Sequence, residues 1–228
     1  MNLRDFSPAR VALGRTGNAI PLRETLAFQL AHAKARDAVF YPFNPALFEG
    51  IHVKSQARDR HEYLRRPDLG RRLDPESKAR LASLESDTVY VICDGLSALA
   101  VEQNAPRLLE LLPPAQTVIC QQGRVAVGDE IGELLQASLA IVLIGERPGL
   151  SAADSMGVYL TWNPHVGRTD AERNCISNIR PEGLSPGAAA ELLGFLMTES
   201  RRRGLSGVAL KAQSSTGEKL ESSASRTI

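Results

Sequence analysis

Three short apolar segments in the middle of the chain predict buried β-strands. They are residues 88–93 (TVYVIC), 116–120 (QTVIC) and 139–145 (LAIVLIG), and most of their side chains are β-branched or aliphatic. Segments with helical spacing follow the first two, at residues 94–112 and 128–138. Strands that are apolar on both faces and alternate with helices are typical of a parallel sheet covered on both sides. We therefore predict an α/β fold with a parallel sheet and flanking helices.

The first 85 residues have a helical and basic pattern. In residues 21–40 (PLRETLAFQLAHAKARDAVF) the leucines recur every four residues, which is typical of an amphipathic helix. Residues 52–84 are highly charged, and two prolines and a glycine divide them into short helical pieces, because proline cannot donate the intrahelical hydrogen bond. We predict a helical, basic N-terminal region at residues 1–85, followed by an α/β domain at residues 86–203.

The pattern weakens after the third strand. A fourth strand is predicted at residues 158–164 (VYLTWNP), and a final helix with a basic last turn at residues 188–203. Between them, residues 165–187 hold too many polar, glycine and proline residues for regular structure. Loops of this length more often than not have a function, so we expect one here. Residues 204–228 are rich in serine and lack aromatic side chains, so we predict a disordered tail.

Charge is segregated along the chain, although its formal sum is only +1. Residues 1–80 carry +6, residues 81–150 carry −6 and residues 151–228 carry +1. This near-neutral total does not suggest a nucleic-acid-binding protein. The longest apolar stretch, at residues 139–144, is far shorter than the roughly 18 residues that span a bilayer, and the N-terminus has no hydrophobic signal core. We expect a cytoplasmic protein with neither nucleic acid nor membrane as a partner.

The cysteines and histidines show no metal-binding spacing. Three cysteines occur without a C-x-x-C pair, and four histidines occur without H-x-x-x-H or H-E-x-x-H spacing, so we expect reduced thiols and no protein-bound metal. The sequence also lacks G-x-G-x-x-G, G-x-x-x-x-G-K-[ST] and G-x-S-x-G. A dinucleotide, a nucleoside triphosphate and a serine nucleophile are therefore disfavoured.

Candidate ligand-binding turns follow the three buried strands. They are Asp94–Ser97, Gln121–Val125 and Gly145–Gly149, and each combines glycine with a polar or charged side chain. In an open parallel sheet the ligand crevice lies beyond the carboxyl ends of the strands. The three turns together therefore favour a ligand site at that edge.

Three further features bear on the chemistry of such a site. Glu146 can accept hydrogen bonds from amide or hydroxyl groups of a ligand. A helix that starts near Gly128 would present free N–H groups to an anion such as a phosphate. Cys175, judged by its surroundings in the sequence, is expected to be a buried structural thiol.

Five long segments carry a family resemblance. They are RVALGRTGNAIPLRETLAFQLAHAKARDAV (10–39), CDGLSALAV (93–101), RVAVGDEIGELL (124–135), LIGERPGL (143–150) and GRTDAERNCISNIRPEGLS (167–185). These collinear segments resemble the small subunit of ethanolamine ammonia-lyase, and the resemblance covers the chain from about residue 10 to about residue 200.

The resemblance implies a part in an adenosylcobalamin-dependent lyase that converts ethanolamine to acetaldehyde and ammonia. In that family a large TIM-barrel subunit carries the substrate and the catalytic side chains. The resemblance implies that the small subunit has a Rossmann-like sheet with flanking helices and holds part of the cobalamin at the subunit interface. The family pattern places cofactor contacts on Val125, Glu146 and Cys175 and no catalytic residue on this chain. The cofactor performs the difficult step, while protein binds, orients and shields it. Because the chain lacks D-x-H-x-x-G, the cobalt is expected to keep its own lower base.

The resemblance also gives the basic first third of the chain an expected role, which is docking on the large subunit. Family members often carry an N-terminal extension associated with entry into a bacterial microcompartment, whereas here the RVALGRTGN motif begins at residue 10. The expected location is cytoplasmic, with encapsulation in such a compartment left open.

Two other interpretations stay open on the sequence alone. The chain can be a stand-alone α/β enzyme that uses Asp94 or Glu146 as acid or base on a phosphorylated small molecule. It can also be a structural partner that never touches a cofactor. Turnover by the isolated chain would favour the first, and a cobalamin-free contact surface would favour the second.

Overall fold

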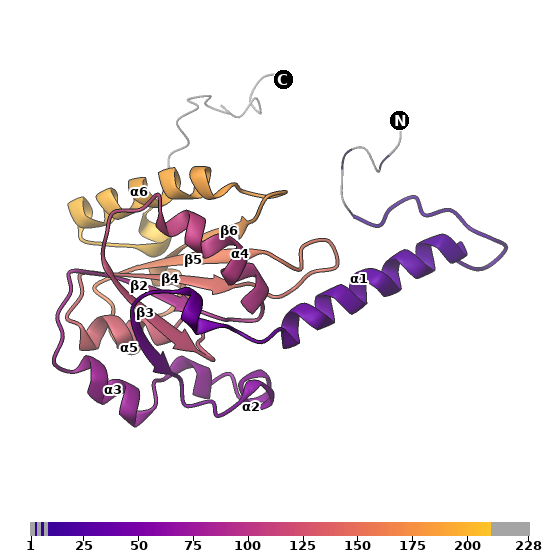
Figure 1. Cartoon of the computed structure of the whole chain (residues 1–228). Coiled ribbons are helices and arrows are strands. Elements are labelled where there is room, and N and C mark those ends of the chain that lie inside the picture. The colour runs from indigo at the N-terminus through magenta and orange to yellow at the C-terminus, as the bar shows by residue number, and fades with distance from the viewer. Residues whose placement is uncertain (1–2, 4–5, 7–8, 211–228) are drawn as a thin grey trace, which may run out of the picture.

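In the computed structural model, which describes residues 3, 6 and 9–210, the fold is built on a six-stranded sheet of order β1-β3-β2-β4-β5-β6 (Figure 1). The strands are β1 (Ile51–Lys54), β2 (Thr88–Cys93), β3 (Gln116–Gln121), β4 (Leu139–Gly145), β5 (Met156–Trp162) and β6 (Arg173–Ile179). β1, β3, β2 and β4 run parallel, whereas β5 is antiparallel to both of its neighbours. The sheet is therefore mixed rather than parallel throughout.

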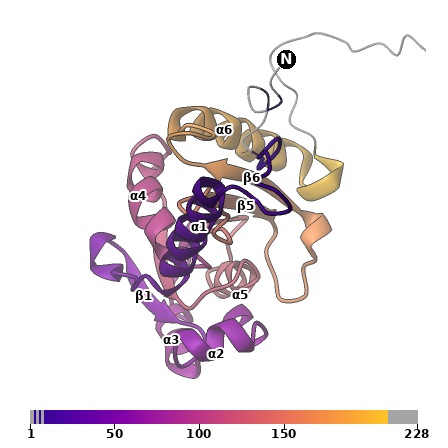
Figure 2. The same ribbon diagram turned by 90° about the vertical axis from the view of Figure 1, so that its right-hand side faces the viewer.

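Helices cover both faces of the sheet (Figure 2). The helices of the described residues are α1 (Leu22–Phe40), α2 (Arg60–Arg65), α3 (Pro75–Leu81), α4 (Ala98–Leu109), α5 (Val127–Leu134) and α6 (Pro186–Arg203). α4 and α6 pack on one face, and α3 and α5 pack on the other. The hydroxyls of Ser97 and Ser185 cap α4 and α6 at their N-termini, and Gly204 ends α6 in the left-handed conformation that glycine adopts without strain.

Two apolar layers bury the central strands. Every residue of β2 and of β4 is buried. Ile92 and Leu143 belong to the layer under α4 and α6, while Val91 and Val142 belong to the layer under α5. Burial on both faces explains why these strands read as continuous apolar segments. The predicted α/β class with flanking helices is confirmed, and the likeness to Rossmann folds stays a prediction.

β5 is the strand that the sequence predicts at residues 158–164, but it runs antiparallel to β4. Only residues 146–155 connect the two strands. A parallel return needs a crossover of about a dozen residues or more, usually a helix, so the short connection returns the chain directly beside β4.

The two edge strands, β1 and β6, are not predicted by the sequence pattern. β6 lies within residues 165–187, where regular structure was not expected, and only Arg173, Ile176 and Ile179 of it are buried. β1 has four residues within the region predicted to be helical, and it pairs with β3. Part of residues 1–85 therefore belongs to the same sheet as the segment that follows it.

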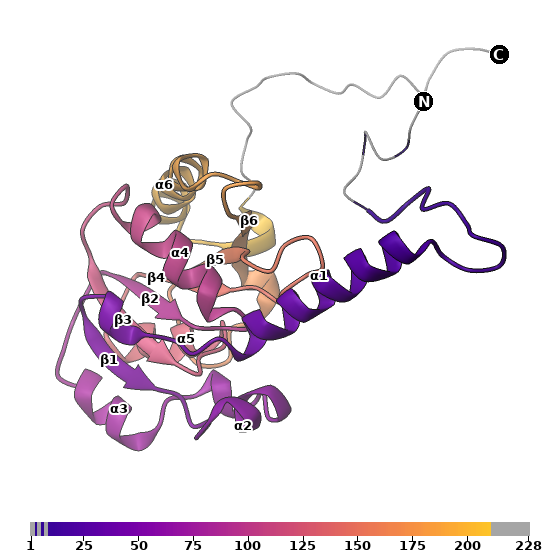
Figure 3. The same ribbon diagram turned by 45° about the vertical axis from the view of Figure 1, so that its right-hand side comes forward.

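α1 confirms the helix predicted for residues 21–40, but it extends away from the sheet (Figures 1 and 3). Ala38 is the buried residue of this helix. Leu22, Leu26 and Leu30 are 72%, 54% and 58% exposed. The leucine stripe of α1 is thus left uncovered.

The predicted tail differs from the structure over its first residues. Residues 204–210 pack beside β6, since Leu210 is buried and its carbonyl accepts a hydrogen bond of 2.7 Å from the Asn174 amide. The remainder of the predicted tail, residues 211–228, lies outside the described residues. Within the described part of the chain, no helix has the length and apolar character required to span a bilayer. The location in the cell stays a prediction.

Candidate functional site

Asp94, the first residue after β2, is buried and connects two of the predicted ligand turns. It is 2% exposed, its Oδ1 accepts a hydrogen bond of 3.2 Å from the Gly123 N–H, and its Oδ2 lies 3.4 Å from Arg60 Nη1. Burial raises the pKa of Asp94 to about 6, opposed by Arg60 and by backbone N–H donors. A carboxylate enclosed in this way holds the turns after β2 and β3 together. It is not placed to act as an acid or base on a substrate.

Backbone atoms fill the crevice between β2 and β4. The Leu96 N–H donates to the Gly145 carbonyl at 2.9 Å. A Cβ on Gly145 would lie 2.0 Å from the Ser97 carbonyl oxygen, so only glycine permits this approach. The chain itself therefore occupies this part of the carboxyl edge.

Glu146, directly after β4, extends over β5. Its carboxylate accepts hydrogen bonds from the Ser155 hydroxyl, from the Ser177 hydroxyl at 2.5 Å and from the Asn178 N–H at 3.3 Å. A Cβ on Gly157 would lie 3.0 Å from Glu146 Oε1, so the glycine leaves room for the carboxylate. The side chain is half-buried. A carboxylate has about four acceptor positions, so it can still accept a hydrogen bond from a ligand.

Cys175 is exposed on β6, contrary to the expectation of a buried structural thiol. It is the register partner of Tyr159 on β5. Desolvation, together with the nearby Glu146 carboxylate, raises the pKa of the Cys175 thiol, although the Tyr159 hydroxyl opposes this. Burial and the Cys175 thiol raise the pKa of Tyr159. Both groups are therefore neutral at physiological pH, and the thiol is not activated as a nucleophile.

Val125 lies at the entrance of α5, beside a cavity of about 430 Å³. Its side chain packs on the apolar layer under α5. Four arginines line the same cavity, and they come from three separate segments of the chain. They are Arg71, Arg124, Arg168 and Arg173. The sequence predicted only the turn that contains Arg124. For Arg71 the only signal in the sequence is the excess of basic residues in the first third of the chain. For Arg168 and Arg173 it is the length of the polar segment after β5.

Val125, Glu146 and Cys175 border one face of the sheet. Successive side chains in a strand point to opposite faces, so Arg173, which lines the cavity beside Val125, shares a face of β6 with Cys175. The hydrogen bond from Ser177 and the electrostatic effect on Cys175 bring Glu146 to that same face. α5 packs on β2 and β4 at this face, and Cys175 beyond it is exposed. Glu146 and Cys175 thus lie close together, and Val125 lies on the same face of the sheet beside α5.

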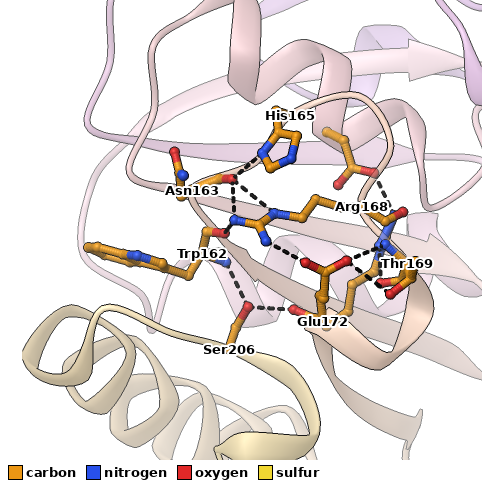
Figure 4. Close-up of polar contacts among 9 residues, drawn as sticks. Trp162, Asn163, His165, Arg168, Thr169, Glu172 and Ser206 are labelled. Atoms are coloured by element: carbon orange, nitrogen blue, oxygen red, sulfur yellow. Dashed lines mark hydrogen bonds and ion pairs between the residues drawn. The ribbon is translucent and has the colours of Figure 1, made fainter.

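A polar network centred on Arg168 fixes the loop between β5 and β6 (Figure 4). Its guanidinium donates to the carbonyls of Trp162 and Asn163 and forms an ion pair with Glu172. Hydrogen bonds from Thr169 and Arg168 lower the pKa of Glu172 to about 2, so this pair stays charged at physiological pH. The Val166 N–H also donates to Glu133 Oε2 of α5 at 2.9 Å, which attaches the loop to that helix.

The described residues contain no group of three or more His, Cys, Asp or Glu side chains that could hold a metal ion. The three cysteines are free thiols, and Cys93 and Cys120 are buried. The site is instead a surface of hydrogen-bond acceptors, neutral donors and arginines.

Comparison with known proteins identifies the family. Residues 1–211 match the family of ethanolamine ammonia-lyase light chains (EutC). An ethanolamine ammonia-lyase small subunit from Pseudomonas aeruginosa (strain UCBPP-PA14) is 51% identical over 99% of this chain and 91% of its own length. The subunit of the same name from Azotobacter vinelandii is 53% identical over 92% of this chain and 86% of its own length. The chain therefore belongs to the family of ethanolamine ammonia-lyase small subunits.

Proposed function

We propose that this chain is the small subunit of an adenosylcobalamin-dependent ethanolamine ammonia-lyase and that it binds the cobalamin where it meets the large subunit. Family membership supports the subunit role in ethanolamine catabolism. The proposal of cofactor binding is supported by one observation. Val125, Glu146 and Cys175 belong to three separate segments of the chain and border one partly open face of the sheet.

The groups on this face suit cobalamin chemically. The corrin ring of cobalamin carries primary amides around its rim, which both donate and accept hydrogen bonds. The Glu146 carboxylate offers acceptors to amide N–H groups, and the neutral Tyr159 and Cys175 offer donors to amide carbonyls. Val125 adds an apolar contact at the entrance of α5.

The division of labour follows from this arrangement. When bound, the cofactor supplies the radical chemistry that such a deamination requires. The residues of this chain bind the cofactor, orient it by hydrogen bonds from separate strands and exclude water from the face that they cover. Since Ser155, Ser177 and Asn178 hold the Glu146 carboxylate in place, its position does not depend on the ligand.

α1 is proposed to dock on the large subunit. It extends away from the sheet (Figure 3). The leucine stripe formed by Leu22, Leu26 and Leu30 is exposed. A stripe of this kind costs free energy in water, because each buried leucine gains roughly 1.5–3 kcal/mol over an exposed one. The same helix carries basic side chains such as Arg23 and Arg36 beside the stripe.

The test compares the large subunit alone with the complex of both full-length subunits. We expect the addition of this chain to be required for cobalamin-dependent release of ammonia from ethanolamine and for tight binding of cyanocobalamin, followed by its absorbance. Equal activity and equal binding in both samples would refute the proposal.

Glu146→Gln then probes the cofactor site within the complex. It keeps the shape of the side chain but turns one acceptor oxygen into a donor, so cobalamin affinity should fall by about tenfold or more. Glu110→Gln is the matched control, because Glu110 pairs with Arg107 on the exposed surface of α4. An unchanged dissociation constant for Glu146→Gln at an unchanged melting temperature would contradict the assignment.

A further inference from the structure

The cavity beside Val125 carries unbalanced positive charge. Among the described residues, Arg71 and Arg124 have no carboxylate partner, whereas Arg168 and Arg173 are paired with Glu172 and Asp129. Asp170 is the one carboxylate that lines the cavity. The unpaired arginines therefore outnumber the lining carboxylates, and the cavity favours an anion.

Several hydrogen-bond donors at this cavity have no acceptor. Within the described part of the chain, the N–H groups of Val125 and Ala126 donate to no protein atom. The Nε atoms of Arg124 and Arg173 are buried and also lack a partner. Arg173 is only 6% exposed, so its unused donor cannot turn to solvent. A buried donor without an acceptor is costly, and the two buried Nε atoms are of this kind. Together with the free N–H groups of Val125 and Ala126, they indicate that a ligand accepts hydrogen bonds in this cavity.

The position of these donors suits a phosphate group. They surround the first turn of α5, whose positive dipole end attracts anions. The acidic residues of that turn do not cancel this effect, because Asp129 is paired with Arg173 and Glu130 with Lys78. Planar guanidinium groups together with free backbone N–H groups are the donors that phosphate oxygens select in proteins.

We propose that this cavity binds a phosphate group, and that the group is the phosphodiester in the nucleotide arm of the cobalamin. The inference rests on the proposed function, since it takes the cofactor to lie on the face bordered by Val125. That residue both lines the cavity and borders the face. The phosphodiester is the anionic group of the cobalamin side arms. A nucleotide arm that passes Val125 would meet the Arg71 guanidinium, the unpartnered Nε of Arg124 and the free N–H groups at the α5 entrance. Free inorganic phosphate has the same chemistry and is the alternative occupant.

The experiment uses the complex of the full-length chain with its large subunit. Equilibrium dissociation constants are measured by absorbance for cyanocobalamin and for dicyanocobinamide, which lacks the nucleotide arm and its phosphate. Arg71→Gln and Arg124→Gln are expected to weaken cyanocobalamin binding by about tenfold each and to leave dicyanocobinamide binding unchanged. Arg107→Gln is the control, because Arg107 pairs with Glu110 on the exposed surface of α4.

The outcomes separate this inference from the proposed function. If the wild-type complex binds cobalamin no better than the large subunit alone, the proposed function fails. The phosphate assignment fails if the wild-type complex binds cobalamin but both variants weaken the binding of cyanocobalamin and of dicyanocobinamide to the same extent. It also fails if neither variant weakens the binding of either ligand. Inorganic phosphate, compared with chloride at equal ionic strength, should compete with cyanocobalamin in the wild type and lose this effect in Arg71→Gln. Phosphate that raises the melting temperature without competing would assign the cavity to a separate anion and overturn the proposal.

Discussion

Replacing Arg173 should destabilise the chain through a defined buried ion pair. Arg173 Nη2 lies 2.5 Å from Asp129 Oδ2, and the two side chains are 2% and 4% exposed. Arg173 also donates to the Thr169 carbonyl at 2.7 Å and to the Arg168 carbonyl at 3.0 Å. One guanidinium therefore joins β6, α5 and the loop between β5 and β6. Arg173→Met keeps most of the side-chain volume but removes all three interactions.

The expected loss follows from what is left behind. Removal of one partner of a buried pair leaves an uncompensated charge and costs about 3–5 kcal/mol. The double variant Arg173→Met/Asp129→Asn no longer buries a charge, so its loss should be limited to the hydrogen bonds at about 1 kcal/mol each. The double variant should therefore be more stable than Arg173→Met by about 2 kcal/mol.

The pH dependence of this loss gives a second test. Burial raises the pKa of Asp129 to about 6, and Arg173 holds it down from a still higher value. A carboxyl whose pKa is raised by folding stabilises the native state most below its unfolded pKa, and this contribution is lost as the pH rises through the folded pKa. Without Arg173, the pKa of Asp129 in the folded state is higher still, so in Arg173→Met this contribution persists to higher pH. The destabilisation should therefore be larger at pH 7.5 than at pH 5.

Urea unfolding of the full-length chain at these two pH values measures both effects. The expected order of stability at pH 7.5 is wild type, then the double variant, then Arg173→Met, with a smaller spread at pH 5. The reasoning is refuted if the double variant is no more stable than Arg173→Met and the loss is the same at both pH values.

Three further variants test α1 and two glycines. Leu26→Glu should leave the unfolding midpoint of the full-length chain unchanged, because Leu26 is 54% exposed. The same variant should weaken assembly with the large subunit, which size-exclusion chromatography measures. Unchanged assembly would show that α1 is not part of the interface. Gly194→Ala in α6 should raise stability by about 0.5–1 kcal/mol, because a Cβ there meets no atom within 4 Å and alanine is the better helix former. Gly145→Ala should prevent folding, because its Cβ would lie 2.0 Å from the Ser97 carbonyl oxygen. Thermal melting measures both glycine variants. Equal changes in melting temperature would show that the space around the added Cβ does not determine the change in stability.

The parts of the fold that could be predicted are those whose residues are buried on both sides. β2 and β4 are buried at every position and almost entirely apolar, because helices cover both faces of the central sheet. β6 could not be found in this way, because one of its faces is polar and its best-buried polar residue, Arg173, is explained only by Asp129 in a distant helix. β1 has only four residues, which is too short for a periodic pattern.

The candidate site was predictable to a different degree at each residue. The rule that ligands bind beyond the carboxyl ends of strands leads to Val125 and Glu146 from the pattern alone. Cys175 came only from the family motif, because a single cysteine in a polar segment gives no local signal. Arg71 could not be named from the sequence, since a long-range contact brings its segment to the cavity: the Arg124 N–H donates to the Gly70 carbonyl at 2.7 Å.

The antiparallel direction of β5 is what brings the site together. β5 begins at the carboxyl end of β4, because Met156 pairs with Gly145, and β6 then returns in the direction of β4. The end of β6 therefore reaches the same edge as the end of β4, where Ser177 and Asn178 donate to Glu146. A helical crossover after β4 would make the next strand parallel, and the strand after it would carry the RNCISNI segment away from this edge. The short connection after β4 is thus the feature that lets one cysteine in a polar segment share a surface with Glu146 and Val125.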